Sequence, residues 1–205
     1  LKRYPNGHFT LGEGAFTVTK EYFNASLRRE YSSILKQYVK STDIFKYGFN
    51  FSDEVLLYVK WDTDINRFPE VHKHLQKFKP ILEAQRDNYD ENYPWYALHR
   101  PRNQYIFEAE KILVPYRSKN NTFGYAVEPV YGSDDVYFIT NKDSAVNLKY
   151  VLALLNSKLY FLWLYHKGKR KGETLELYYT PLSESPIKIH GVEQKSFIDV
   201  VDKKS

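Results

Sequence analysis

Residues 148–187 of the sequence read LKYVLALLNSKLYFLWLYHKGKRKGETLELYYTPLSESPI, and this stretch decides the fold. It begins as an apolar run of helical character, which Asn156-Ser157 interrupts and which then resumes. A segment with four cations and two glycines follows, and after it a strand-like TLELYY and a proline-containing exit. We therefore expect two consecutive helices that form a hydrophobic platform, then a mobile basic loop, then a strand.

The composition is that of a globular protein large enough to bury a core. Of 205 residues, 42% are hydrophobic and 27% are charged, which is ordinary for a folded domain. The aromatic share of 17%, with 19 tyrosines, is high and is typical of strands and contact surfaces. The net charge of +5 favours a polyanionic partner without naming one.

Several classes of chemistry are excluded or disfavoured by the sequence. The absence of cysteine excludes disulfides, thiolate nucleophiles and cysteine-ligated zinc. No metal site is expected, because His72 and His74 are two apart on a predicted helix and point in different directions; both are expected to be solvated polar residues. No apolar run is long enough to span a membrane, and no signal peptide is expected from the pattern. The chain starts at Leu1 and contains no methionine, so we expect it to be a piece of a longer protein.

The pattern along the chain predicts helices in the first half and strands in the second. A strand at 16–18 should lead into a helix over 20–39, and a strand at 55–60 should precede a helix over 70–86 that breaks at Pro80. Short strands are then expected at three places, with turns between them. They are residues 111–117, 123–129 and 136–141. The sequence thus predicts an α+β fold with mixed or antiparallel sheets and packed helices. A gradual boundary near residues 103–110 should divide a helix-rich half from a strand-rich half.

A set of motifs in a fixed order carries a resemblance to a known family. They are FTVTKE (16–21), LKQYVKSTDIFKY (35–47), LLYVK (56–60), FPEVHKHLQKFKPILEAQRD (68–87), WYALHRPR (95–102), FEAEKILVPYR (107–117), LKYVLALLNSKL (148–159), GKRKG (168–172) and SPI (185–187). Together they resemble the C-terminal target recognition domain of TaqI-like N6-adenine DNA methyltransferases, and of single-chain type II restriction–modification enzymes that contain such a domain. Ser41-Thr42 stands where the family has Gly-Arg, so no contact of that arginine is carried over.

The resemblance implies a recognition domain over residues 1–189, followed by a polar tail at 190–205. Its partners would be double-stranded DNA and a methyltransferase domain of the same chain or of a partner subunit, in the cytoplasm of a prokaryote. S-adenosylmethionine is expected in that methyltransferase domain. This chain has neither a glycine-rich cofactor loop nor the family's Asn-Pro-Pro-Tyr-type turn, since Tyr93 replaces the first proline of Asn92-Tyr93-Pro94-Trp95. Alone it is expected to bind no cofactor and to catalyse nothing.

Basic and amide side chains in and beside these motifs are the candidate DNA contacts. They are Lys36, Lys40, Lys46, Arg100, Arg102, Arg117, Lys119, Asn120, Asn121, Lys167, Lys169, Arg170 and Lys171. Lysines suit phosphate contacts, whereas arginine can pair with guanine and asparagine with adenine. Each group has a simpler alternative: a solvated hairpin turn for 167–171, stacking on Trp95 or Tyr96 for the two arginines at 100–102, and an ordinary turn for 120–121.

Two other functions remain open from the sequence. The first is a specificity subunit of a multi-subunit restriction system, because such subunits contain modules that resemble this domain in fold. A basic RNA-binding or protein-interaction module is the alternative from a different class. A preference for single strands, or binding that is insensitive to duplex sequence, would favour that last reading.

Overall fold

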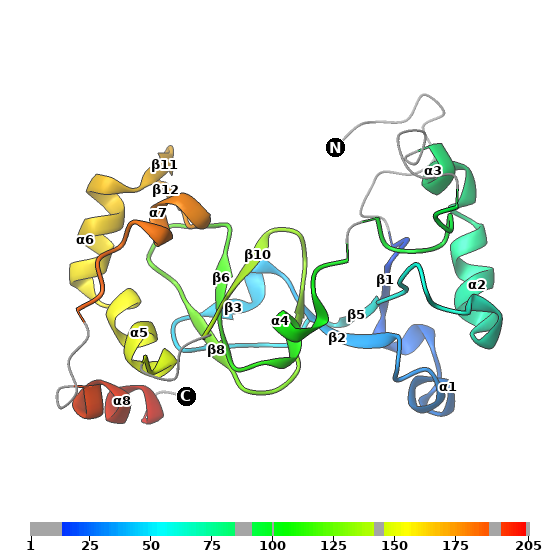
Figure 1. Ribbon diagram of the computed structural model, residues 1–205, viewed down its shortest axis with the longest axis horizontal. Helices are drawn as coiled ribbons and strands as arrows, with labels where there is room; N and C mark the ends of the chain where they lie inside the picture. Colours follow the sequence, from blue (N-terminus) through cyan, green and yellow to red (C-terminus); the bar gives the residue numbers. More distant parts are fainter. Residues whose placement is uncertain (1–13, 85–91, 100, 142–145, 189–193, 204–205) are drawn as a thin grey trace. The chain divides into compact units, whose positions relative to one another are not determined.

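The structure is a computed structural model that describes residues 14–84, 92–99, 101–141, 146–188 and 194–203 (Figure 1). The chain divides into two compact units. The first comprises Leu1–Gln37 and Asp53–Arg102, and the second comprises Tyr38–Ser52 and Asn103–Ser205.

The first unit contains a small antiparallel sheet with helical segments after its strands. Strand β5 (Glu54–Leu57) pairs on one side with β1 (Thr17–Thr19) and on the other with the start of β2 (Leu35–Val39). Strands β1 and β5 confirm, to within the usual uncertainty of their ends, the strands predicted at 16–18 and 55–60. The helical segments are η1 (Lys20–Tyr22), α1 (Ala25–Glu30), η3 (Ile65–Arg67), α2 (Pro69–Gln76) and α3 (Lys79–Ala84).

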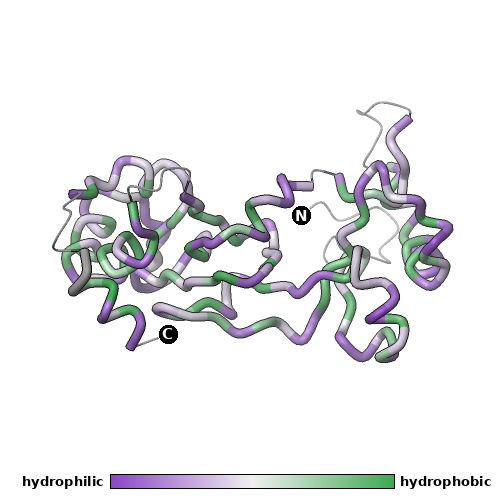
Figure 2. The backbone as a smooth tube through the Cα atoms, turned by 60° about the horizontal axis from the view of Figure 1, so that its bottom comes forward, coloured by the Kyte–Doolittle hydropathy of each residue, from purple (hydrophilic) through white to green (hydrophobic). Residues whose placement is uncertain are grey.

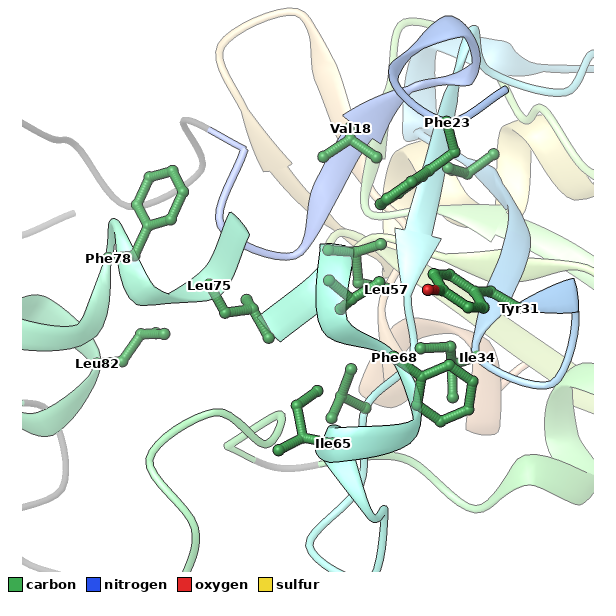
Figure 3. Close-up of a cluster of buried hydrophobic side chains, with 13 residues drawn as sticks. Val18, Phe23, Tyr31, Ile34, Leu57, Ile65, Phe68, Leu75, Phe78 and Leu82 are labelled. Atoms are coloured by element: carbon green, nitrogen blue, oxygen red, sulfur yellow. The ribbon is translucent and has the colours of Figure 1, made fainter. Parts of the chain in front are cut away.

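A single hydrophobic core holds the first unit together (Figure 3). Leu57 of β5 and Leu75 of α2 are fully buried in it. The Tyr31 ring meets Phe23 and Phe68 edge to face, with centroids 6.3 and 5.2 Å apart, a geometry that aromatic pairs favour. Burial of these side chains is what fixes the helical segments against the sheet.

The helix predicted over residues 20–39 is wrong in its second half. Helix α1 begins after Asn24, whose side chain accepts a hydrogen bond from the backbone N–H of Leu27 (2.9 Å), and ends at Glu30. After a turn the chain forms β2, because the backbone of Leu35–Gln37 completes the ladder with β5. Pairing with a neighbouring strand outweighs the local helical pattern. The main apolar residues of this segment are buried in the strand as they would be in a helix.

The break predicted near Pro80 is confirmed. Helix α2 starts with Pro69 at its first position and ends at Gln76, and α3 begins at Lys79. A proline near the start of a helix has no N–H to leave unsatisfied, so Pro69 and Pro80 both fit their places.

His74 of α2 is buried, which corrects the expectation that it is solvated. Its Nε2 lies 2.7 Å from the carbonyl oxygen of Gly14, and its Nδ1 lies 3.1 Å from the hydroxyl of Tyr22. The Gly14 carbonyl can only accept, so Nε2 donates to it, whereas either Nδ1 or the Tyr22 hydroxyl can donate in the second bond, depending on the protonation of the ring. Burial lowers the pKa of His74 below its ordinary value of 6.5, and the nearby Lys77 lowers it further, against backbone hydrogen bonds that raise it.

Acidification should therefore weaken the first unit through His74. The pKa is lower in the folded chain, so the unfolded chain binds more protons, and stability falls as the pH drops below about 6.5. We expect urea midpoints of the unsubstituted chain to decline over this range more steeply than those of His74→Gln. His72, half-buried on the same helix, offers the control: His72→Gln should retain the full decline. A midpoint-versus-pH curve unaltered by His74→Gln would contradict this assignment.

The second unit is built on an antiparallel sheet whose central strand is β6 (Lys111–Pro115). It lies between β10 (Val136–Thr140) and β8 (Gly124–Ala126). The predicted strands in these three regions are therefore confirmed. Smaller pairings complete the unit: β3 (Ile44–Phe45) with β4 (Gly48–Phe49), the end of β2 in parallel with β9 (Tyr131–Gly132), and β12 (Thr174–Glu176) between β7 (Arg117–Ser118) and β11 (Lys169–Lys171).

Two consecutive helices, α5 (Leu148–Leu155) and α6 (Lys158–Lys167), confirm the platform predicted from the sequence. Asn147 and Ser157 cap them, each accepting a hydrogen bond from a backbone N–H in the first turn. The remaining helical segments are η2 (Ser41–Asp43), α4 (Gln104–Glu108), α7 (Tyr179–Ser183) and α8 (Gln194–Asp202). Helices beside antiparallel and mixed sheets confirm the predicted α+β class.

The C-terminal segment is more than the polar tail expected from residue 190. Helix α8 packs along α5, with Val201 fully buried and the Phe197 ring edge-on to Tyr150 at 5.5 Å. Lys149 of α5 also pairs with Asp202. Three apolar or ionic contacts on one side of a short helix are enough to dock it where the composition alone suggested a loose end.

Hydrophobic and hydrophilic residues are interspersed along the backbone (Figure 2). Within the described part of the chain, no helix is both long and apolar enough to cross a membrane.

Candidate nucleic-acid interface

The basic segment after α6 forms a hairpin strand, which corrects the expectation of a loop. Lys171 of β11 lies opposite Thr174 of β12, so a two-residue turn of Gly172 and Glu173 joins the strands. Gly172 has φ +60, a value that tight hairpin turns require and that glycine adopts without strain. The cationic residues thus form the outer strand of a three-stranded sheet, a position where exposed lysines are common.

The hairpin starts directly at the end of α6 (Figure 1). The backbone N–H of Gly168 donates to the carbonyl oxygen of Leu164 (3.0 Å), and a Cβ on this glycine would lie 2.4 Å from the same oxygen. A larger residue there would push the strand away from the helix end. Gly168 therefore sets the direction in which the basic strand leaves the helical platform.

The four predicted cations of this segment are all exposed: Lys167, Lys169, Arg170 and Lys171. Two of them have fixed neighbours. The Cζ atom of Arg170 lies 4.1 Å from the ring centre of Tyr165, and the Nζ atom of Lys169 lies 3.6 Å from Oε2 of Glu176. The structure therefore presents positive charge on a supported hairpin, where backbone pairing reduces the freedom of the chain.

Arg117 joins the same sheet from β7. Its Nε and Nη2 atoms donate to Oε1 of Glu176 at 3.1 and 2.9 Å. Its guanidinium also lies 4.7 Å from the ring centre of Tyr116. Arg117 is far from the hairpin cations in the sequence, and the sheet brings it close to them, because β12 pairs with both β7 and β11.

The two adjacent asparagines in the turn after β7 have different environments. Lys119 and Asn120 are exposed, as a DNA contact requires. Asn121 is buried, and its Nδ2 donates to the carbonyl oxygens of Leu155 (2.6 Å) and Ser157 (2.7 Å). Its amide donates inside the protein, so its role as a base contact stays a prediction that would require these bonds to break.

Lys46 is also engaged within the second unit. Its Nζ donates to the carbonyl oxygen of Asn156 (2.9 Å) and to Oδ1 of Asn121 (3.2 Å). The ammonium therefore satisfies the end of α5 and the amide of Asn121. Lys46 is exposed, so its phosphate contact stays a prediction, and making that contact would compete with these two hydrogen bonds.

The other predicted contacts belong to other segments of the chain. Lys40 is half-buried in the second unit, and its backbone N–H donates to Asp43 (2.8 Å). Lys36 and Arg102 are half-buried in the first unit; the Lys36 ammonium lies 3.4 Å from the carbonyl oxygen of Ser32. Arg100 lies outside the described residues.

Sequence reasoning missed the residue that links these cations, Glu176. Its side chain is buried, and it sits opposite both Lys169 and Arg117 in the strand register. The alternation in TLELYY carries a usable signal: with Leu175 and Leu177 facing the core, Glu176 must face the other side of the sheet. What the alternation does not give is which strands lie beside it.

This sheet and helices α5 and α6 belong to the second unit of a mixed α+β fold. A family model described as the TaqI-like C-terminal specificity domain matches residues 36–187, and the chain belongs to this family. The resemblance stated from the sequence is thereby confirmed.

Two curated relatives are type II methyltransferases of Haemophilus influenzae. The chain is 30% identical to M.HincII over 135 residues, which are 62% of this chain and 27% of the relative. It is 29% identical to M.HindII, of strain Rd, over 166 residues, which are 77% of this chain and 32% of the relative. The chain thus spans about a third of the length of these relatives or less.

A solved structure has a similar fold. It is that of the type IIL restriction–modification enzyme MmeI in complex with DNA, with a TM-score of 0.61 and 17% identity. The match covers 93% of this chain and 25% of the MmeI chain. Identity at this level shows the fold alone, so the likeness agrees with the α+β architecture.

Proposed function

We propose that this chain recognises a specific sequence of double-stranded DNA within a larger DNA methyltransferase or restriction–modification enzyme. The observation that carries the proposal is the supported basic hairpin of a TaqI-like specificity domain. Lys169, Arg170 and Lys171 would contact DNA from the hairpin, Lys167 from the end of α6 just before it, and Arg117, Lys119 and Asn120 from beside it. Lysines there would fix the register on phosphates, while arginine and asparagine would pair with base edges.

The catalytic step would belong to a methyltransferase domain outside residues 1–189. That domain would take its methyl group from S-adenosylmethionine and place it on N6 of an adenine that this chain positions. The sequence Gly12-Glu13-Gly14 lacks the third glycine of a dinucleotide-binding loop. Its described glycine, Gly14, has its carbonyl bonded to His74, and a Cβ on it would meet the Thr17 carbonyl at 3.1 Å, so Gly14 serves packing within the first unit. The bacterial source of the relatives supports a place in a bacterial cytoplasm.

Selection from random-core duplexes by the purified full chain would test the proposal. One enriched sequence that contains an adenine is expected, together with weaker binding to the separated strands and to an RNA duplex. Equal enrichment of all sequences would contradict sequence-specific recognition. Tighter binding to single strands or to RNA would support an RNA-binding module instead. A specificity subunit would give the same enrichment but would form a complex with a separate methyltransferase chain.

A further inference from the structure

Three charged residues form a continuous row across the β11–β12–β7 sheet. Glu176 occupies the middle strand, with Lys169 directly opposite on one side and Arg117 directly opposite on the other. Oppositely charged residues in directly opposed positions attract each other across a sheet. The row therefore follows from strand register and does not depend on a chance meeting of long side chains.

The carboxylate of Glu176 is enclosed although its two partners reach solvent. Its side chain is 6% exposed, compared with 39% for Arg117 and 67% for Lys169. Oε1 accepts both bonds from Arg117, while Oε2 has no hydrogen-bond partner among the described residues and faces the Lys169 ammonium at 3.6 Å. A buried carboxylate is costly unless cations accompany it, so this one holds its partners close.

Tyrosine rings restrict the same two cations from a second direction. Arg117 lies against Tyr116 and Lys169 lies over Tyr178, and the centres of these two rings are 5.7 Å apart. The bonds to Glu176 raise the pKa of Arg117, and contacts with Tyr178 and then Glu176 raise the pKa of Lys169. Both side chains are thus held in defined positions while part of each remains open to solvent.

We infer that Glu176 is a positioning residue for sequence discrimination: it fixes Arg117 and Lys169 so that they meet base edges and phosphates in one register. The inference rests on the proposed DNA recognition. A carboxylate in a basic surface opposes general attraction to phosphate, which lowers binding to every sequence alike. Its benefit is geometric, because a fixed donor fork discriminates between base edges and a mobile one does not.

The test compares two glutamates of the same hairpin by the same change. Glu176→Leu and Glu173→Leu each remove one negative charge, but Glu173 is an exposed turn residue. Removing one partner of an ion pair is costly when it leaves a buried charge alone. Here the two cations that Glu176→Leu leaves behind, Arg117 and Lys169, are 39% and 67% exposed and can be hydrated, so both full-length variants should fold. For each, the salt-dependent affinity for random duplexes and the enrichment of the selected sequence over random duplexes are measured.

Glu176→Leu should bind random duplexes at least as tightly as the unsubstituted chain, yet lose about tenfold in discrimination. Glu173→Leu should show the same gain on random duplexes with its discrimination intact. Equal discrimination in the two variants would overturn the inference. A chain that discriminates between no duplexes before substitution would instead refute the proposed function. Should Glu176→Leu fail to fold, Glu176→Asp keeps the charge but withdraws the carboxylate; undiminished discrimination in that variant would overturn the inference equally.

Discussion

Replacing Asn121 with alanine is expected to lower the free energy of unfolding by about 2–3 kcal/mol. The side chain is 2% exposed and donates to the carbonyls of Leu155 and Ser157, at the junction of α5 and α6. It also accepts from the Lys46 ammonium. Alanine would leave the two carbonyl oxygens without this donor, and water cannot easily take its place inside the protein. Equilibrium unfolding in urea, followed by circular dichroism and tryptophan fluorescence, would measure the loss.

The neighbouring residue provides a matched control. Asn120 has the same side chain but is exposed, so Asn120→Ala should change the free energy of unfolding by less than about 0.5 kcal/mol. The pair also separates two roles for Asn121. If Asn121→Ala kept full stability but bound duplex DNA weakly, Asn121 would contact DNA after all, and its interior hydrogen bonds would not matter.

Asn156 should behave like Asn121 and be coupled to it. Its side chain makes two hydrogen bonds to the backbone of Phe123, and its carbonyl oxygen accepts from Lys46. Residues within one such network give non-additive effects. The double variant with Asn121 should therefore lose less stability than the two single losses added together.

What the sequence predicts well here is local. The division between α5 and α6 is visible in Asn156-Ser157 because the cap residues lie next to the helix they cap. Pro69 marks the start of α2 for the same reason, since its restricted φ acts on its own backbone. The apolar positions of both units are buried largely as their spacing indicates, whichever secondary structure carries them.

What the sequence does not predict depends on pairing between distant segments. Residues 35–39 have a helical pattern but form β2, because β5 offers its edge. Residues 169–171 have the composition of a loop but form β11 against β12. Asn120 and Asn121 are identical in type and adjacent, so only the fold shows that one is exposed and the other is buried.

The candidate site follows the same division. Its cations were found from composition, because a dense run of lysine and arginine is visible without any structure. Glu176 was not found, because its role comes from lying between Arg117 and Lys169 in a sheet that joins two segments far apart in the chain. The positions of the cations can thus be predicted from the sequence, whereas only the structure shows that Glu176 holds Arg117 and Lys169 in place.

Neutralising the hairpin should have the largest effect on DNA binding. We expect the variant in which Lys167, Lys169, Arg170 and Lys171 are all changed to glutamine to bind duplexes about 10²- to 10³-fold more weakly at roughly 0.1 M salt. Each lost phosphate contact also lowers the slope of log affinity against log salt by about 0.9. The slope should fall by about 2–3 and not by the full sum, because Arg170 is stacked on Tyr165 and Lys169 faces Glu176.

A charge-matched variant decides whether position or total charge matters. Changing four exposed cations of α1, α2 and the residue after α2 to glutamine removes the same charge from helices of the first unit; they are Arg28, Arg29, Lys73 and Lys77. If the hairpin contacts DNA and these four cations do not, this variant keeps most of its salt slope, because only cations that contact phosphates contribute to the slope. Equal losses in the two variants would mean that net charge alone attracts DNA, and the hairpin would then be an ordinary solvated turn.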